Sequence, residues 1–168
     1  MGIKEPSNLL NKQFSSRVAE LYDIEKRSVK LYQKMAKAAY TAELQTALSP
    51  SSTESPAHLQ RLKLIMESQH IKPIKRNDLQ NNPFPDLVIS TSVNKRKKDM
   101  RNDSTIIFNV MVIQKYKEAI YDFLYLNSIA LQIEHASPLL AQCISDHKNT
   151  YAWLTQILQN IVNPEINE

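Results

Sequence analysis

The chain has 168 residues, of which 42% are apolar and 23% are charged, values ordinary for a globular protein of one domain. It contains one glycine, Gly2, which excludes a Walker loop, a Rossmann fingerprint and a glycine-flanked nucleophile elbow and favours helices over sheets. The single cysteine, Cys143, excludes an intramolecular disulfide and a cysteine-rich zinc site. The formal net charge of +4 is only mildly basic, so it does not by itself indicate an anionic partner.

The first predicted helix runs from about residue 8 to residue 40. Its apolar residues recur at alternating spacings of four and three, which defines one face of a long amphipathic helix. Glu25 lies in the middle of this face, where a carboxylate requires a cation, a hydrogen-bond donor or a proton. The full stripe consists of Leu10, Phe14, Val18, Leu21, Glu25, Ser28, Tyr32, Met35 and Ala39.

The second predicted helix begins near Thr41 and is broken between Pro50 and Pro56. Each of these prolines follows a serine, a pair typical of a helix N-cap and its first turn, so we expect the helix to restart near Pro56. Residues from about 70 to 103 are rich in proline and asparagine and predict a long crossover. This crossover has room for a short helix or extended piece around residues 87–89.

The third helix is predicted from about residue 104 to residue 134, and the fourth begins at Ser137 as N-cap and ends at Pro164. Trp153 and Ile157 flank the apolar stripe of the fourth helix. This widened face predicts either deeper packing or a homodimer contact. The two stripes consist of Ile107, Val110, Gln114, Tyr121, Leu124 and Leu131 on the third helix, and of Leu140, Ile144, His147, Tyr151, Leu154, Leu158 and Ile161 on the fourth.

Two helices, a long crossover and two further helices form the layout of an all-α, ferritin-like four-helix bundle. We expect residues 1–168 to form a single domain of this kind, with the second helix broken. No apolar run suits a signal peptide or a membrane span, so the expectation is a cytoplasmic protein without a membrane partner.

Short motifs on all four helices resemble those of the YciF-type ferritin-like family, a group of bacterial stress-associated proteins of unknown biochemical function. The family typically has Tyr-x-x-Glu-Lys on its first helix, and a Glu followed four residues later by His or Gln, then Arg-Leu, on its second. The matching segments here are Leu21–Lys26, Glu54–Leu62, Gln114–Lys117 with Tyr121, and Asp146–Lys148 with Leu154.

The resemblance implies a metal site between the helices, with fewer carboxylates than a di-iron centre needs. Gln114 stands where the family typically has a glutamate, and Lys117 replaces a second acidic residue. The remaining groups suffice for one ion of iron, manganese or zinc rather than for two irons. The implied metal ligands are Glu25, Glu54, His58, Asp146 and His147.

Each of these residues also has an ordinary structural reading. Glu25 could be a buried carboxylate paired with a lysine or histidine, and Glu54 a solvated acid in a first helical turn. His58 could make a local hydrogen bond, and His147 could be a core histidine that donates to Glu25 or to a tyrosine hydroxyl. Asp146 could face solvent.

Three functions follow from these readings. The first is a ferritin-like, stress-associated protein of unknown biochemical role, with a weak or lost di-metal site. The second is a metal-dependent oxidoreductase, such as a ferroxidase. The third is a bundle that associates with anions or nucleic acid through the basic run from Lys95 to Arg101. Because this run has no interleaved aromatic residues for base stacking, nucleic acid is not the expected partner. The expected partner is a second copy of the chain, in a homodimer.

Overall fold

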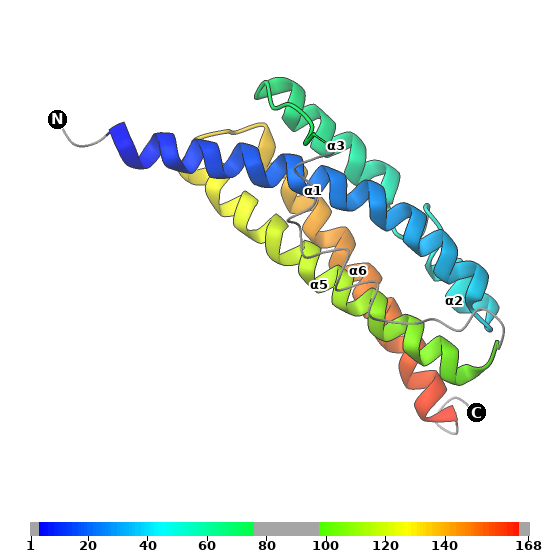
Figure 1. Ribbon diagram of the computed structural model, residues 1–168. Coiled ribbons are helices and arrows are strands. Elements are labelled where there is room, and N and C mark those ends of the chain that lie inside the picture. The colour runs from blue at the N-terminus through cyan, green and yellow to red at the C-terminus, as the bar shows by residue number, and fades with distance from the viewer. Residues whose placement is uncertain (1–3, 76–97, 165–168) are drawn as a thin grey trace.

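The computed structural model describes residues 4–75 and 98–164. Within these ranges the chain forms five helices, and α2 and α3 together make up the fourth rod of a four-helix bundle (Figure 1). The piece expected around residues 87–89 and the first part of the basic run lie outside the described residues. The helices are α1 (Lys4–Ala38), α2 (Ala42–Ala47), α3 (Ser55–Ser68), α5 (Met100–Ala130) and α6 (Ala136–Val162).

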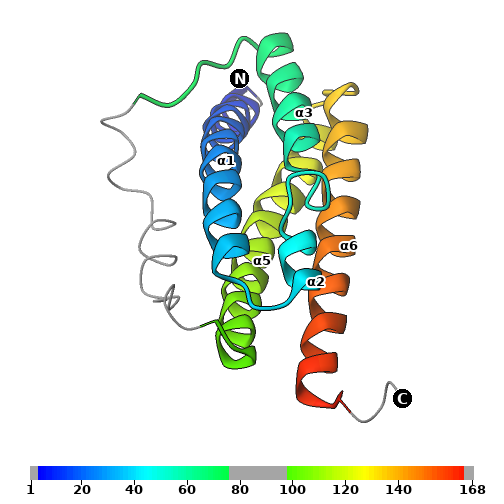
Figure 2. The same cartoon turned by 90° about the vertical axis from the view of Figure 1, so that its right-hand side faces the viewer.

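The helices occupy the four corners of the bundle. α1 packs against α3 and α5, α5 packs against α6, and α6 returns to α2 and α3 (Figure 2). The all-α bundle with a broken second helix, which the sequence predicts, is confirmed. No helix in the described ranges is long and apolar enough to cross a membrane.

The break between α2 and α3 is built from serine, threonine and proline. Pro50 has no backbone N–H and cannot continue the helix. The Ser49 carbonyl instead accepts hydrogen bonds from the Thr53 N–H and the Thr53 hydroxyl, each at 3.0 Å. Glu54 then adopts a left-handed conformation with φ of 54°, and α3 restarts with Pro56 in its first turn.

α5 is displaced toward the N-terminus relative to its prediction. It begins at residue 100 because Asp99 acts as its N-cap and accepts a hydrogen bond from the Asn102 N–H at 2.8 Å. It ends at residue 130 rather than 134, because the chain turns through Gln132, which has φ of 58°.

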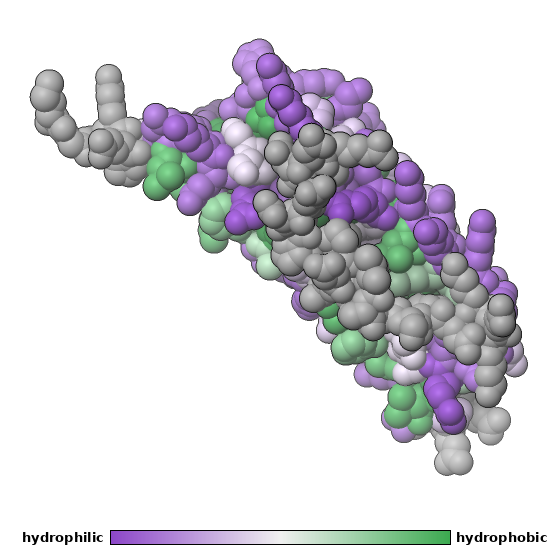
Figure 3. Space-filling model, in the orientation of Figure 1, coloured by the Kyte–Doolittle hydropathy of each residue, from purple (hydrophilic) through white to green (hydrophobic). Residues whose placement is uncertain are grey.

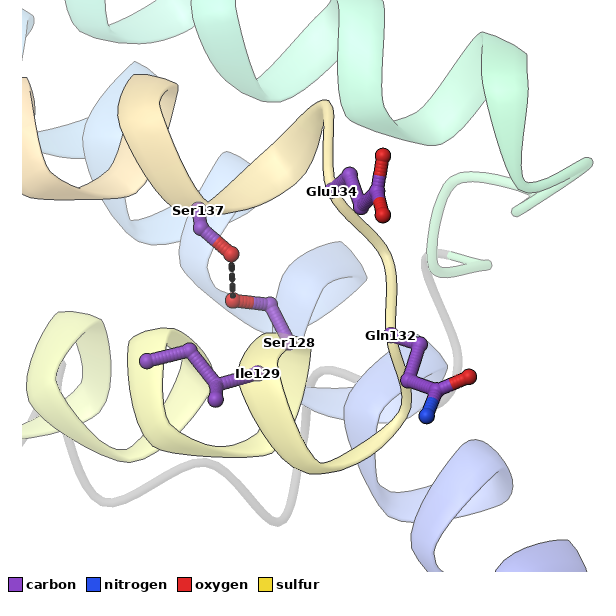
Figure 4. Close-up of a pocket in the computed structure, with 5 residues that line it drawn as sticks. All are labelled: Ser128, Ile129, Gln132, Glu134 and Ser137. Atoms are coloured by element: carbon purple, nitrogen blue, oxygen red, sulfur yellow. Dashed lines mark hydrogen bonds between the residues drawn. The ribbon is translucent and has the colours of Figure 1, made fainter.

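The predicted N-cap of the last helix, Ser137, lies inside α6 instead. Its hydroxyl forms a hydrogen bond of 2.9 Å with the Ser128 hydroxyl, which joins α6 to the end of α5 (Figure 4). The two serines, Ile129, Gln132 and Glu134 line a pocket at this turn. The pocket contains no histidine or cysteine side chain, so it offers no nitrogen or sulfur ligand to a metal.

Asp103 connects the turn between α1 and α2 to the start of α5. Its fully buried carboxylate accepts hydrogen bonds from the Tyr40 N–H at 2.6 Å and from the Thr41 N–H at 2.9 Å. It also accepts one from the Thr41 hydroxyl at 2.7 Å. These bonds satisfy backbone N–H groups that would otherwise have no acceptor at a helix end.

The core consists of two apolar clusters with a polar layer between them. One cluster lies around α2 and the first half of α5, and the other around α3 and the turn between α5 and α6. On α1, Glu25 lies between Leu21 of the second cluster and Tyr32 of the first. On α5, Lys117 lies between Ile113 of the first cluster and Tyr121 of the second, and on α6, His147 lies between Cys143 of the second cluster and Leu154 of the first.

Trp153 and Ile157 both pack inward. Ile157 is 2% exposed and belongs to the first apolar cluster, and Trp153 packs against that cluster. Packing within the monomer therefore explains the widened face of α6, and the homodimer stays a prediction. The apolar side chains that reach the surface are instead frequent on α5, where green areas are visible among polar ones in Figure 3.

We expect Asp103→Ala to lower the free energy of unfolding by about 2–4 kcal/mol, because it leaves two backbone N–H groups without an acceptor. Asp103→Asn retains one acceptor oxygen, so its free energy of unfolding should fall by about half as much. Urea denaturation followed by circular dichroism measures both variants. Equal stability of Asp103→Ala and the wild type would contradict the role of this carboxylate.

Candidate metal centre

Glu25 is the centre of the polar layer and receives hydrogen bonds on both carboxylate oxygens. Lys117 Nζ donates to Oε2 at 3.0 Å, and the Tyr121 hydroxyl donates to Oε1 at 2.9 Å. Glu25 is fully buried, and Lys117 is 1% exposed. The carboxylate predicted to be costly on the helix face is thus compensated by a lysine and a tyrosine from α5.

The charges of this pair are mutually dependent. Burial by itself would raise the pKa of the Glu25 carboxyl, but the Lys117 ammonium, together with the imidazoles of His147 and His58, outweighs burial and holds that pKa well below its usual value. Burial would likewise lower the pKa of Lys117, but Glu25 and, after it, Tyr32 together raise it above its usual value. Both groups are therefore charged, as an ion pair within the core.

Two histidines face the same carboxylate oxygen from the other side of the bundle. His58 on α3 places Nδ1 at 3.5 Å from Glu25 Oε1, and His147 on α6 places Nε2 at 3.4 Å from it. Their rings are stacked with centroids 4.5 Å apart. One ligand atom from each of these three residues lies within 4.8 Å of the others, so the group has the dimensions of a metal site.

The remaining nitrogen of each imidazole has an acceptor as its partner. His147 Nδ1 donates to the Cys143 carbonyl at 2.7 Å, and His58 Nε2 donates to Asp146 Oδ2 at 3.2 Å. Because a carbonyl and a carboxylate oxygen only accept hydrogen bonds, each of those nitrogens bears a proton. The opposite nitrogens, His58 Nδ1 and His147 Nε2, have no hydrogen-bond partner although they are buried.

The charge state of His147 follows from its surroundings. Burial, and then the nearby Lys117 ammonium, lower the pKa of this imidazole below its usual value. A neutral ring with its proton on Nδ1 directs the lone pair of Nε2 toward Glu25 Oε1. Two lone pairs that face each other across 3.4 Å repel, unless a cation lies between them.

The tyrosine and glutamine around the pair fill the rest of the layer. Gln114 Nε2 donates to the Tyr32 hydroxyl at 3.0 Å, while Gln114 Oε1 has no hydrogen-bond partner. Lys117 Nζ lies 5.1 Å from the centre of the Tyr32 ring. Burial, and then the Glu25 charge, raise the pKa of Tyr121 well above its usual value, so its hydroxyl remains a donor.

The structure brings together three of the five predicted ligands, namely Glu25, His58 and His147. Asp146 lies outside this group, where it contacts the far side of His58. Glu54 is exposed at the N-cap of α3, and only its backbone meets the group, where its carbonyl accepts a hydrogen bond from the His58 N–H at 3.0 Å. Metal binding by any of the five stays a prediction.

Two contacts of the centre do not follow from the motifs. The Tyr121 hydroxyl bond to Glu25 and the ion pair of Arg61 Nη1 with Asp146 Oδ2, at 2.6 Å, were not predicted. A signal for the Lys117 contact was present in the sequence, because Lys117 follows Gln114 by three residues and precedes Tyr121 by four. That spacing places all three on one helix face.

Comparisons with known proteins agree with this architecture. A family model described as a domain of unknown function, DUF892, matches residues 10–167. The crystal structure of the E. coli stress protein YciF superposes with a TM-score of 0.80 and 21% sequence identity, covering 93% of this chain and 98% of that one. Among curated proteins, none matches the chain. The resemblance predicted from the motifs is confirmed, and the chain belongs to the DUF892 family.

Proposed function

We propose that this protein binds a single divalent transition-metal ion through Glu25, His58 and His147. The observation that supports the proposal is the pair of unpartnered imidazole nitrogens that face one carboxylate oxygen, at 3.5 and 3.4 Å. Both rings have their other nitrogen bonded to an acceptor, the arrangement usual for histidines that ligate metals. Two imidazoles and a carboxylate suit iron, manganese or zinc.

A proton is a poorer explanation for this geometry than a metal ion. An N–H···O hydrogen bond is usually about 2.7–3.2 Å long, and both distances to Glu25 Oε1 exceed that range. The lowered pKa of His147 also disfavours an imidazolium at this position. A metal ion of ordinary size bonds to nitrogen and oxygen at about 2.0–2.2 Å, so modest side-chain adjustment would seat it among the three atoms.

Lys117 limits the centre to one ion. Its ammonium occupies the second oxygen of Glu25, the position from which a carboxylate would otherwise bridge to another cation. The neighbouring amide of Gln114 adds no negative charge. Because Lys117 already neutralises Glu25, a divalent ion enters with little charge compensation, and its affinity should be modest.

The biological setting is proposed from the relative. YciF is described as a stress protein, and we propose that this chain likewise acts in a stress response, as a metal-binding bundle. The biochemical step that it performs there is not specified by the centre alone, because the same ligands serve several chemistries.

Equilibrium dialysis against Zn²⁺, Mn²⁺ or anaerobic Fe²⁺ should yield about one bound ion per chain, as expected for one group of three ligands. Glu25→Gln and His147→Ala should each weaken binding by more than the roughly 10–100-fold that loss of an outer hydrogen-bond partner costs.

The matched control is Glu54→Gln, which removes an exposed carboxylate that lies outside the centre and should leave binding unchanged. Two ions per chain would contradict the single-ion proposal. An absence of binding would show that the polar layer is an ion-pair core only.

Lys117→Met should strengthen metal binding by at least about tenfold, because a unit charge roughly 5 Å from a divalent ion is worth about 6–7 kcal/mol at an effective dielectric constant of about 20. When a chelator has removed all metal, the free energy of unfolding of the same variant should be about 3–5 kcal/mol lower than that of the wild type, because Glu25 is left buried without its cation. Isothermal titration calorimetry and urea denaturation measure the two effects.

Lys115→Met is the control for this experiment, since Lys115 lies on the same helix but is exposed and pairs with Glu118. It should change neither quantity appreciably. Weaker metal binding by Lys117→Met would mean that the ammonium supports the site rather than opposes it.

A further inference from the structure

The two histidines of the centre are oriented by different kinds of partner. His147 bonds to a backbone carbonyl one turn earlier on its own helix, so its orientation does not depend on any other side chain. His58 has no such bond. Its ring is held by the carboxylate of Asp146, which comes from α6 across the interface with α3.

Asp146 is held in place by Arg61. Arg61 Nη1 donates to Asp146 Oδ2 at 2.6 Å, the same oxygen that lies 3.2 Å from His58 Nε2. Arg61 follows His58 by three residues on α3, so both side chains reach Asp146 from one helix face. The pair is 15% and 18% exposed, whereas His58 is 1% exposed, so it covers the outer edge of the ring.

We infer that Asp146 positions His58 for metal binding rather than binding the metal itself. An ionised carboxylate only accepts hydrogen bonds, so it requires the His58 proton on Nε2 and leaves the lone pair of Nδ1 directed at Glu25. Without that acceptor, the proton can move to Nδ1 and donate to Glu25 Oε1, which blocks the ligand position. The inference rests on the proposed metal site and assigns a role within it.

The geometry distinguishes this role from that of a ligand. Asp146 contributes no atom to the group whose ligand atoms lie within 4.8 Å of one another. Its contacting oxygen faces the nitrogen of His58 that points away from Glu25. A metal bound to Nδ1 of His58 therefore lies on the opposite side of the imidazole from Asp146.

Nuclear magnetic resonance can determine the tautomer of His58 directly in metal-free protein. In chain labelled with ¹⁵N-histidine and held at about pH 8, where an ordinary imidazole is neutral, proton–nitrogen correlation spectra show which ring nitrogen has the proton. The His58 signals are identified by their loss in His58→Gln. Wild-type protein should have the proton on Nε2, and Asp146→Ala should move a large fraction of it to Nδ1.

Zn²⁺ affinity, measured by competition with a chromophoric chelator, should fall about 10–100-fold in Asp146→Ala. Asp146→Asn should retain the wild-type tautomer and an affinity within a few-fold of wild type. The Arg61 guanidinium can only donate hydrogen bonds, so in Asp146→Asn it should orient the amide with its oxygen, rather than its nitrogen, toward Arg61 and His58. A purely structural role for Asp146 would alter stability in the alanine variant without moving the tautomer.

Asp23→Asn is the control, because Asp23 forms an ion pair with Arg27 on α1 and touches no histidine. It should change neither the tautomer nor the affinity. A wild-type His58 with its proton on Nδ1, or an Asp146→Ala variant with unchanged tautomer and affinity, would overturn the inference. A tautomer shift in protein that binds no metal would overturn the proposed function and leave the positioning of His58 supported.

Discussion

The ion pair between Glu25 and Lys117 is the constraint on which the rest of the centre depends. Neither charge has contact with water, and each stabilises the charged form of the other. A buried pair of this kind is often no more stabilising than well-packed apolar side chains of similar volume. The polar layer separates two apolar clusters that could otherwise be continuous, so packing alone does not account for it. The proposed role in metal binding would account for it.

The histidines extend the same reasoning. The stacked imidazoles have acceptors behind them and a carboxylate in front, and both imidazole protons are directed away from the space between the three groups. Ammonium and metal would then share one carboxylate, each on its own oxygen. This division differs from a centre with two irons, where bridging carboxylates serve both ions.

Helix periodicity predicted the helical rods and the unusual position of Glu25, the long crossover favoured the bundle, and the two Ser-Pro pairs predicted the break in the second rod. It was less informative about details decided by individual side chains. α5 begins earlier than predicted because Asp99 caps it, and Ser137 bonds to Ser128 instead of capping α6. The first is a local cap that apolar periodicity does not reveal, and the second depends on a contact with a neighbouring helix.

The candidate site was predictable only in part, for a related reason. Stripe membership identified Glu25 and His147, since burial follows from periodicity. It did not determine which partner each group meets, because the Lys117 and Tyr121 contacts with Glu25 join residues more than ninety positions apart. Glu54 lies only four residues before His58, yet the left-handed backbone at Glu54 leaves its side chain exposed.

The interruption between α2 and α3 has a consequence for how solutes reach the interior. α3 has 14 residues, against 35, 31 and 27 in α1, α5 and α6, and it is joined to α2 by a turn rather than by continuous helix. Because a turn joins the two helices, local opening of α3 need not extend into α2. Outward movement of α3 would break the contact of His58 with Asp146 and uncover Leu62 and Ile65, but it would leave α5 in contact with both α1 and α6. Under the proposed function, this movement would give an ion access to the centre.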